Sequence, residues 1–264
     1  MFKHRSSFLA LVFVMMLGLS ACSSMPKSAD EHSAYSDNDP IEPLNRAIFD
    51  VNDFLDRLLL RPLAELYRFV TPPELRDRVT NILANMAEPV IAANSLLQGE
   101  VTNASTSLGR LVVNSTVGLG GVFEVAEEAG LDKQSADFGQ TLHVWGAGEG
   151  PYLMLPFFGP SNLRDTTGLI VDSLMSPWKY VVAYGDTVIE DSFQVSSMGA
   201  TGLSRREANI EGLDAIREGS LDFYAQMRSV YRQHRAKQIG GPIVNQLPDF
   251  DEDYDAENST PVIR

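Results

Sequence analysis

Hydrophobic residues recur along much of the chain with the spacing of an α-helix. From Leu44 to Leu58 they lie three or four residues apart, while residues of opposite charge are paired four apart on the other side of the same stretch. The preceding Asp39-Pro40-Ile41-Glu42 has the residue types typical of a helix start, with Asp39 as the N-cap. The pattern therefore predicts an amphipathic helix that ends near Leu60, followed by a restart at Pro62.

Similar apolar stripes, separated by prolines and glycines, predict further short helices. We expect them at residues 62–70, 73–88, 90–97, 101–113, 122–129, 162–176, 186–197 and 205–239, the last with a break near Gly219. Thr71 and Ser204 are each followed three residues later by glutamate, which predicts capping boxes, and Ser161 is the expected cap of the helix that follows it. The fold class is therefore all-α, with one domain whose 44% apolar residues can bury a substantial core.

The stretch from Asp137 to Asp165 is apolar but cannot form a long helix. It contains Gly146, Gly148, Gly150, Pro151, Pro156 and Pro160. Glycine gives the backbone too much freedom for a regular helix, and proline removes a donor and clashes with the preceding turn. Two interpretations stand side by side: a core hairpin with tight turns, or a non-helical element that lines a site for an apolar ligand.

The N-terminus has the form of a bacterial lipoprotein signal. Residues 1–21 combine a cationic start with an apolar segment too short to span a bilayer, and Leu19-Ser20-Ala21-Cys22 has the form of a lipobox. An ordinary secretory signal is the alternative. Cys22 is the only cysteine, so an intramolecular disulfide is impossible. Lipidation of Cys22 with palmitate-type acyl chains would anchor the protein, and Ser23 favours the outer membrane, on its periplasmic side.

The charge is strongly acidic, with a formal net charge of −14. Because phosphate-backbone binding needs clustered Lys and Arg, a nucleic-acid partner is not expected. Residues 22–38 are polar and serine-rich and predict a flexible tether, residues 39–241 the helical domain, and residues 242–264 an acidic disordered tail. Beyond the signal no stretch of 18 apolar residues indicates a transmembrane helix.

Catalytic constellations are missing from the sequence. Of the four histidines only His143 lies in a plausible cleft, and a lone histidine makes neither a metal site nor a triad, so His143 is interpreted as structural. Gly118-Leu119-Gly120-Gly121 lacks the following Lys-Ser/Thr of a phosphate loop. We therefore expect no enzyme activity, no metal and no cofactor.

Charged residues beside the central stretch suggest ion pairs. Asp137 and Asp165 flank it, and Arg110 and Arg164 are candidates to pair with them and hold loops in place. Arg164 is alternatively a candidate contact for a phosphate headgroup, because it lies at a predicted helix start. The basic end of the last helix, with Arg228, Arg232 and Arg235, is interpreted as a solvated helix terminus.

Several motifs in a fixed order resemble the VacJ/MlaA family of outer-membrane lipoproteins. They are Asp39-Pro40-x-Glu42-x-x-Asn45-Arg46-x-x-Phe49, Asn85 with Pro89, Asn94-x-Leu96-Leu97-Gln98-Gly99, Asn114-x-Thr116-x-Gly118-x-Gly120-Gly121, Asp137 to Leu142, Gly150-Pro151-Tyr152 and Leu163-Arg164-Asp165. Each motif alone is weak, but together they cover the domain from about Asp39 to about Gly241.

The resemblance implies a ring-like, membrane-embedded helical body with a central amphipathic channel. Through it, mislocalised phospholipids would leave the outer leaflet and pass to a soluble periplasmic carrier, with a trimeric porin as partner. The glycine-rich hairpin that gates the channel maps onto Trp145 to Gly150, with Gly146 and Gly148 as hinges and Gly150 at its end. His143 and Phe223 depart from the family pattern. A structural lipoprotein that scaffolds porins and a lipid-modifying hydrolase are the alternative functions.

Overall fold

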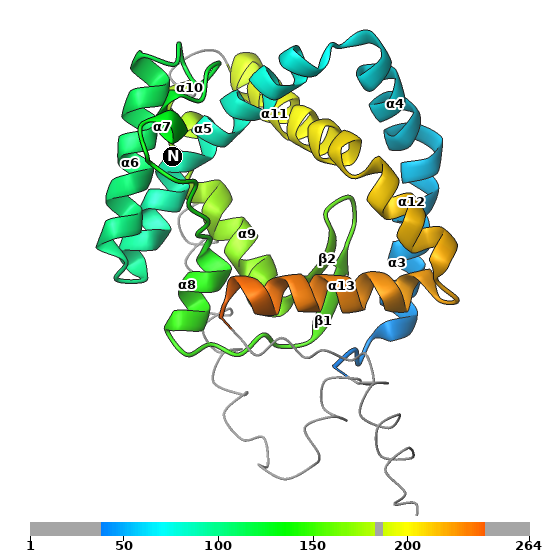
Figure 1. The fold of residues 1–264 in the computed structure, drawn as a ribbon. Helices are drawn as coiled ribbons and strands as arrows, with labels where there is room; N and C mark the ends of the chain where they lie inside the picture. Colours follow the sequence, from blue (N-terminus) through cyan, green and yellow to red (C-terminus); the bar gives the residue numbers. More distant parts are fainter. Residues whose placement is uncertain (1–37, 183–186, 241–264) are drawn as a thin grey trace, which may run out of the picture. The chain divides into compact units, whose positions relative to one another are not determined.

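A computed structural model describes residues 38–182 and 187–240 of the chain, and the folded unit begins at Asp39. The helices and strands are α3 (Glu42–Leu55), the π-helical segment η2 (Asp56–Leu60), α4 (Arg61–Val70), α5 (Pro73–Leu97), α6 (Val101–Thr116), α7 (Val125–Glu128), α8 (Phe138–Val144), β1 (Tyr152–Leu155), β2 (Gly159–Asn162), α9 (Leu163–Met175), α10 (Pro177–Val182), α11 (Thr187–Ala208), α12 (Ile210–Gly219) and α13 (Phe223–Gln238) (Figure 1). The predicted all-α class is confirmed. The signal, Cys22, the tether to residue 37 and the acidic tail lie outside the described residues.

Two predicted helix boundaries are wrong. Helix α5 runs through Pro89 to Leu97 as one element, and α11 continues through Ser204 instead of beginning there. Proline in a helix interior removes one hydrogen bond and strains one turn, but it does not decide the fold alone. Helix α5 packs along α6, and α11 packs against α4 and α5. These tertiary contacts offset the local preference for a break.

The helix caps also differ from those predicted. Helices α3 and α5 begin without a side-chain cap, so neither Asp39 nor Thr71 serves as one, and α9 is capped by Asn162, one residue after Ser161. Asp39 is buried, and its carboxylate accepts hydrogen bonds from Asn45, Tyr224 and Arg228. Because Tyr224 and Arg228 of α13 bind the Asp39 carboxylate, it does not cap the first turn of α3.

Polar side chains fill the interior of the described structure. Its largest fully buried side chains are Arg110, Asn45, Asn94, Thr141, Ser95 and Ser107. The buried apolar residues are mainly alanines, joined by Tyr152, Met154, Ile210 and Tyr224. The apolar content is sufficient for a substantial core, but in the described residues small and polar side chains fill most of the interior.

Large apolar side chains remain on the surface instead. Leu44, Val51 and Leu58, which belong to the predicted stripe of the first helix, are more than half exposed, and α4 carries Phe69 at 88% exposure. Over the parts of the chain that the structure describes, no helix is both long and apolar enough to cross a bilayer.

The two strands form an antiparallel hairpin that packs between helices. Tyr152 pairs with Asn162 and Leu155 with Gly159, which leaves residues 156–158 at the tip. Strand β1 contacts α3 and strand β2 contacts α13 (Figure 1). The inward side chains of β1, Tyr152 and Met154, form a cluster with Tyr224 of α13. The prediction of a core hairpin is confirmed for the residues from Tyr152 to Asn162.

Candidate functional site

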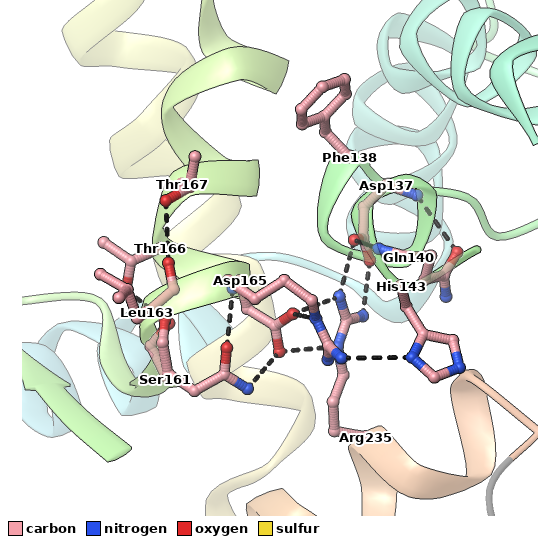
Figure 2. A network of polar contacts seen from close by, with 12 residues as sticks. Asp137, Phe138, Gln140, His143, Ser161, Leu163, Asp165, Thr166, Thr167 and Arg235 are labelled. Atoms are coloured by element: carbon pink, nitrogen blue, oxygen red, sulfur yellow. Dashed lines mark hydrogen bonds and ion pairs between the residues drawn. The ribbon is translucent and has the colours of Figure 1, made fainter. Parts of the chain in front are cut away.

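A network of charged side chains joins the base of the β-hairpin to three helices (Figure 2). Arg235 of α13 bridges two carboxylates. Its Nε lies 2.8 Å from Asp165 Oδ2, and its Nη1 lies 2.6 Å from Asp137 Oδ2. A second contact to each carboxylate makes both pairs bidentate, the arrangement that the planar guanidinium forms most strongly. Asp137 in turn caps α8 through a capping box with Gln140.

Asp165 accepts hydrogen bonds from several elements in this network. Besides Arg235, its carboxylate accepts hydrogen bonds from Arg164 Nε at 2.9 Å, Asn162 Nδ2 at 2.9 Å and Tyr231 Oη at 2.7 Å. Burial alone would raise the pKa of Asp165, but its arginine partners and Tyr231 hold the pKa below its usual range. The stabilisation from this carboxylate is therefore present at neutral pH and is lost as the pH falls through the lowered pKa.

The basic end of α13 is not a solvated terminus, and that interpretation is wrong. Arg228 pairs with Asp39, Arg232 with Glu149, and the side chain of Arg235 is only 11% exposed. Asp39 lies 189 residues before Arg228, and Glu149 lies 83 residues before Arg232. Asp165 lies 70 residues before Arg235, in helix α9. No local pattern in the sequence signals such pairs, which is why sequence analysis missed them.

Of the two arginines predicted to pair with Asp137 or Asp165, only Arg164 does so. Arg164 is buried and pairs with Asp165, as predicted, while its Nη1 lies 3.4 Å from His143 Nδ1. Its Nη2 is buried without a hydrogen-bond partner. Arg110 contacts neither flanking carboxylate, so that part of the prediction is wrong, and it pairs with Glu88 and Glu124 instead. A headgroup contact by Arg164 stays a prediction.

The glycine segment, residues 145–150, connects α8 to β1 and contains no strand. The strands begin only at Tyr152, so the hairpin lies after the segment to which the resemblance assigned it. Gly146 has a φ of 91° and Gly150 a φ of 68°, both in the left-handed region that favours glycine, whereas Gly148 does not. Trp145 donates from its indole Nε1 to the carbonyl of Leu97 at 3.1 Å. The hinge role of Gly146 and Gly148 stays a prediction.

Two asparagines of α3 hold the free edge of β1. Asn45 donates to the carbonyl of Tyr152 and accepts from the amide of Met154, at 3.1 and 2.8 Å. Asn52 donates to the carbonyl of Leu155 and accepts from the amide of Phe157, at 2.9 and 3.0 Å. Each side-chain amide thus replaces the peptide group of a neighbouring strand. Asn45 and Asn52 are seven residues apart, which is two helical turns, so both side chains lie on one face of α3. This spacing is the feature of the sequence that could have indicated that both asparagines bind the same strand.

Close packing of α8 on α9 brings the network together. A Cβ added to Gly168 would lie 2.5 Å from the amide nitrogen of Gly139, and one added to Gly139 would lie 2.5 Å from Arg235 Nη2. Real Cβ atoms do not approach so closely. The two glycines therefore let the helices approach each other and leave room for the arginine.

The substitution Asp172→Asn is expected to stabilise the protein at pH 7. Asp172 of α9 accepts from Asn94 Nδ2 at 2.7 Å and from the amide of Phe138, and an asparagine oxygen can accept both. Burial raises the pKa of Asp172, with a smaller contribution from Asp137, so its ionised form is disfavoured in the folded state. Unfolding by urea at pH 7 and pH 4 measures the gain, which should be smaller at pH 4 because the raised pKa lets the wild-type carboxyl take up a proton more readily as the pH falls.

Asp132→Asn on the surface is the matched control for that measurement. Asp132 is exposed, and the substitution should leave stability unchanged at both pH values. A lower stability of Asp172→Asn at pH 7 would mean that the carboxylate's hydrogen bonds outweigh its burial.

Within residues 38–182 and 187–240, no group of three or more His, Cys, Asp or Glu side chains is placed to hold a metal ion. The bidentate pairs of Arg235 join α13 to the start of α8 through Asp137 and to α9 through Asp165.

The described residues form a helical protein with a largely polar interior and many exposed large apolar side chains, and its hairpin is held by Asn45 and Asn52. Residues 37–238 match the family model described as MlaA lipoprotein. The chain belongs to the MlaA lipoprotein family, and the resemblance found in the sequence is confirmed.

Relatives and a solved structure agree with this assignment. The chain is similar to the intermembrane phospholipid transport system lipoprotein MlaA of Shigella flexneri, with 31% identity over 88% of this chain and 87% of that protein. An uncharacterized protein of Rickettsia bellii is 34% identical over 77% of this chain and 78% of its own length. A solved structure described as "Structural basis for maintenance of bacterial outer membrane lipid asymmetry" superposes with a TM-score of 0.65 at 30% identity, covering 76% of this chain and 98% of that one.

Proposed function

We propose that this protein is an outer-membrane lipoprotein that moves phospholipids and so maintains the lipid asymmetry of that membrane. Mislocalised phospholipids would leave the outer leaflet through an amphipathic channel in the helical body and pass to a soluble periplasmic carrier. A trimeric porin is the proposed partner in the membrane, and lipidated Cys22 the anchor on the periplasmic side. No catalytic step is part of this proposal.

The observation that carries the proposal is that polar side chains are buried while many large apolar side chains are exposed. In water, a surface with this many large apolar side chains would favour aggregation, whereas in a bilayer it contacts acyl chains at no cost. Buried polar groups such as Arg110 and Asn94 need partners within the protein in either solvent. Short amphipathic helices of this kind suit a position in one leaflet or at the interface.

The proposed channel needs a body of helices arranged around it. The element contacts support this. They run from α3 and η2 to α4 and from α4 to α11; the chain then passes through Asn209 to α12, and further contacts run from α12 to α13, from α13 to β2 and from β1 back to α3. Non-helical backbone such as the β-hairpin is tolerated at membrane depth where it lines a cavity. The names of the relatives, which include intermembrane phospholipid transport, agree with phospholipid as the transported molecule.

The test compares surface phospholipid in three strains. Intact cells that lack the gene, cells complemented by the wild type and cells complemented by Cys22→Ala are digested with an added phospholipase, and the released products are measured. We expect the deletion to raise surface phospholipid and the wild type, but not Cys22→Ala, to restore it. A deletion without any rise would contradict transport and favour a structural lipoprotein that scaffolds porins.

A further inference from the structure

The tip of the β-hairpin contains an aromatic residue in a strained backbone conformation. Phe157 has a φ of 65°, in the left-handed region that bulky residues rarely adopt. Glycine or asparagine fits such a position more readily. Residues held in this way persist only where the surrounding structure fixes them, and they concentrate at functional sites.

The strained residue does not help to pack the protein. Phe157 is 79% exposed and its neighbour Phe158 is 60% exposed, whereas Tyr152 and Met154 at the base of the same hairpin are buried. The tip therefore presents two aromatic rings to its surroundings at a position where a smaller residue would relieve the strain.

Asn52 fixes the tip in this conformation. Its Oδ1 accepts from the amide of Phe157 at 3.0 Å, and its Nδ2 donates to the carbonyl of Leu155 at 2.9 Å. Asn45, two turns earlier on α3, makes the same pair of bonds to the base of β1. The backbone that carries Phe157 is thus held by a side chain from another element before any ligand arrives, which lowers the entropic cost of binding.

We propose that Phe157 and Phe158 form a contact site for the acyl chains of a phospholipid, with Asn52 as its positioning residue. The inference rests on the proposed function and adds the site at which the lipid tail is held. Neither ring carries a hydrogen-bonding group, so the complementary ligand chemistry is a hydrocarbon chain rather than a headgroup.

The decisive variant is Phe157→Asn, because it separates stability from function. Asparagine adopts positive φ more readily, so the melting temperature of the purified protein in detergent should be unchanged or higher. Loss of the ring should nevertheless raise surface phospholipid, measured by phospholipase digestion of intact cells, to at least half of the level in cells that lack the gene. Phe158→Ser should give the same rise in surface phospholipid. Because Phe158 does not have a positive φ, this variant replaces Phe157→Asn in the test if that protein is poorly produced.

Phe69→Asn is the matched control, since Phe69 of α4 is an exposed phenylalanine outside the hairpin. It should leave surface phospholipid at the wild-type level. Asn52→Ala tests the positioning role: hydrogen exchange of the peptide covering residues 155–159 should become faster, and surface phospholipid should rise while both rings remain.

Three outcomes would overturn the inference. The first is a wild-type level of surface phospholipid with both Phe157→Asn and Phe158→Ser, and the second is an equal rise with Phe69→Asn. The third is a photo-crosslinker at position 158 that captures only protein and no phospholipid in cells. None of these outcomes would contradict the proposed function, which is tested by the difference in surface phospholipid between cells that lack the gene and cells complemented by the wild type.

Discussion

Replacing Arg110 with methionine should reduce the free energy of unfolding by about 3–5 kcal/mol, the usual result of removing one partner from a buried ion pair. The Arg110 side chain is 1% exposed, and its Nε lies 2.6 Å from Glu88 Oε1. It also donates to the carbonyl of Leu131 at 2.6 Å and to Glu124. Methionine leaves the Glu88 carboxylate buried without a cation. In a thermal melt, a loss of this size lowers Tm by about 6–20 °C for a domain of about 200 residues.

The double variant Glu88→Leu with Arg110→Met should recover more than half of that loss. Replacing both partners of a buried pair with apolar residues of similar size is often neutral or stabilising. Glu124 keeps Lys133 as a partner at 2.7 Å in the double variant. Arg57→Met is the surface control, because the Arg57 side chain is 57% exposed and its partner Asp53 keeps Arg217; it should change stability by less than about 1 kcal/mol. An unchanged Tm for Arg110→Met would contradict a stabilising role of this buried ion pair.

Local patterns in the sequence predict which segments are helical, but they do not predict how the helices face their surroundings. The stripe from Leu44 to Leu58 correctly indicated a helix. The stripe does not say what the apolar side contacts, and in the structure Leu44 and Leu58 are exposed. An apolar stripe is compatible with both situations, because lipid and a protein core are equally apolar. A stripe that faces lipid is distinguished from one that faces a protein core only by the burial of polar residues such as Asn45 and Asn94. Burial depends on the tertiary structure and cannot be read from the local sequence.

The failures at helix boundaries have a related cause. Capping boxes at Thr71 and Ser204 and a stop at Pro89 follow from preferences of about 1–3 kcal/mol per residue. Contacts between whole helices outweigh terms of this size, as the unbroken α5 and α11 demonstrate. Asp137 is a cap that the structure has and that the sequence analysis did not predict.

The candidate site was only partly visible in the sequence. The central stretch was identified by its glycines and prolines, and a hairpin was expected there and found. The ion pairs that support it were missed, since Arg235 lies 98 residues from Asp137 and 70 from Asp165. Charged residues indicate a pairing from sequence only when they lie within a few residues on one helix. The asparagines at 45 and 52 show that spacing on a helix face can still indicate two residues with the same structural role.

Valine at position 146 and valine at position 148 should both abolish transport, but for different reasons. Gly146 has a φ of 91°, so Gly146→Val is strained in the present conformation and should move the path of the glycine segment. Gly148 has no positive φ, and an added Cβ would meet nothing within 4 Å. Gly148→Val therefore fits the structure as it stands and should leave Tm unchanged. Its effect on surface phospholipid reports whether the segment must move.

Hinge motion is the hypothesis that this pair of variants tests. If the glycine segment opens and closes the channel, a β-branched residue at position 148 restricts the backbone and surface phospholipid rises to the level of the gene deletion. Gly99→Val is the control for strain alone, because Gly99 has a φ of 81° with open space around it and lies outside the segment. Normal transport with Gly148→Val, combined with failure of Gly146→Val, would contradict the hinge. In that case glycine is needed at position 146 only for the static shape of the connection, and the rigid hairpin held by Asn45 and Asn52 would act without a moving gate.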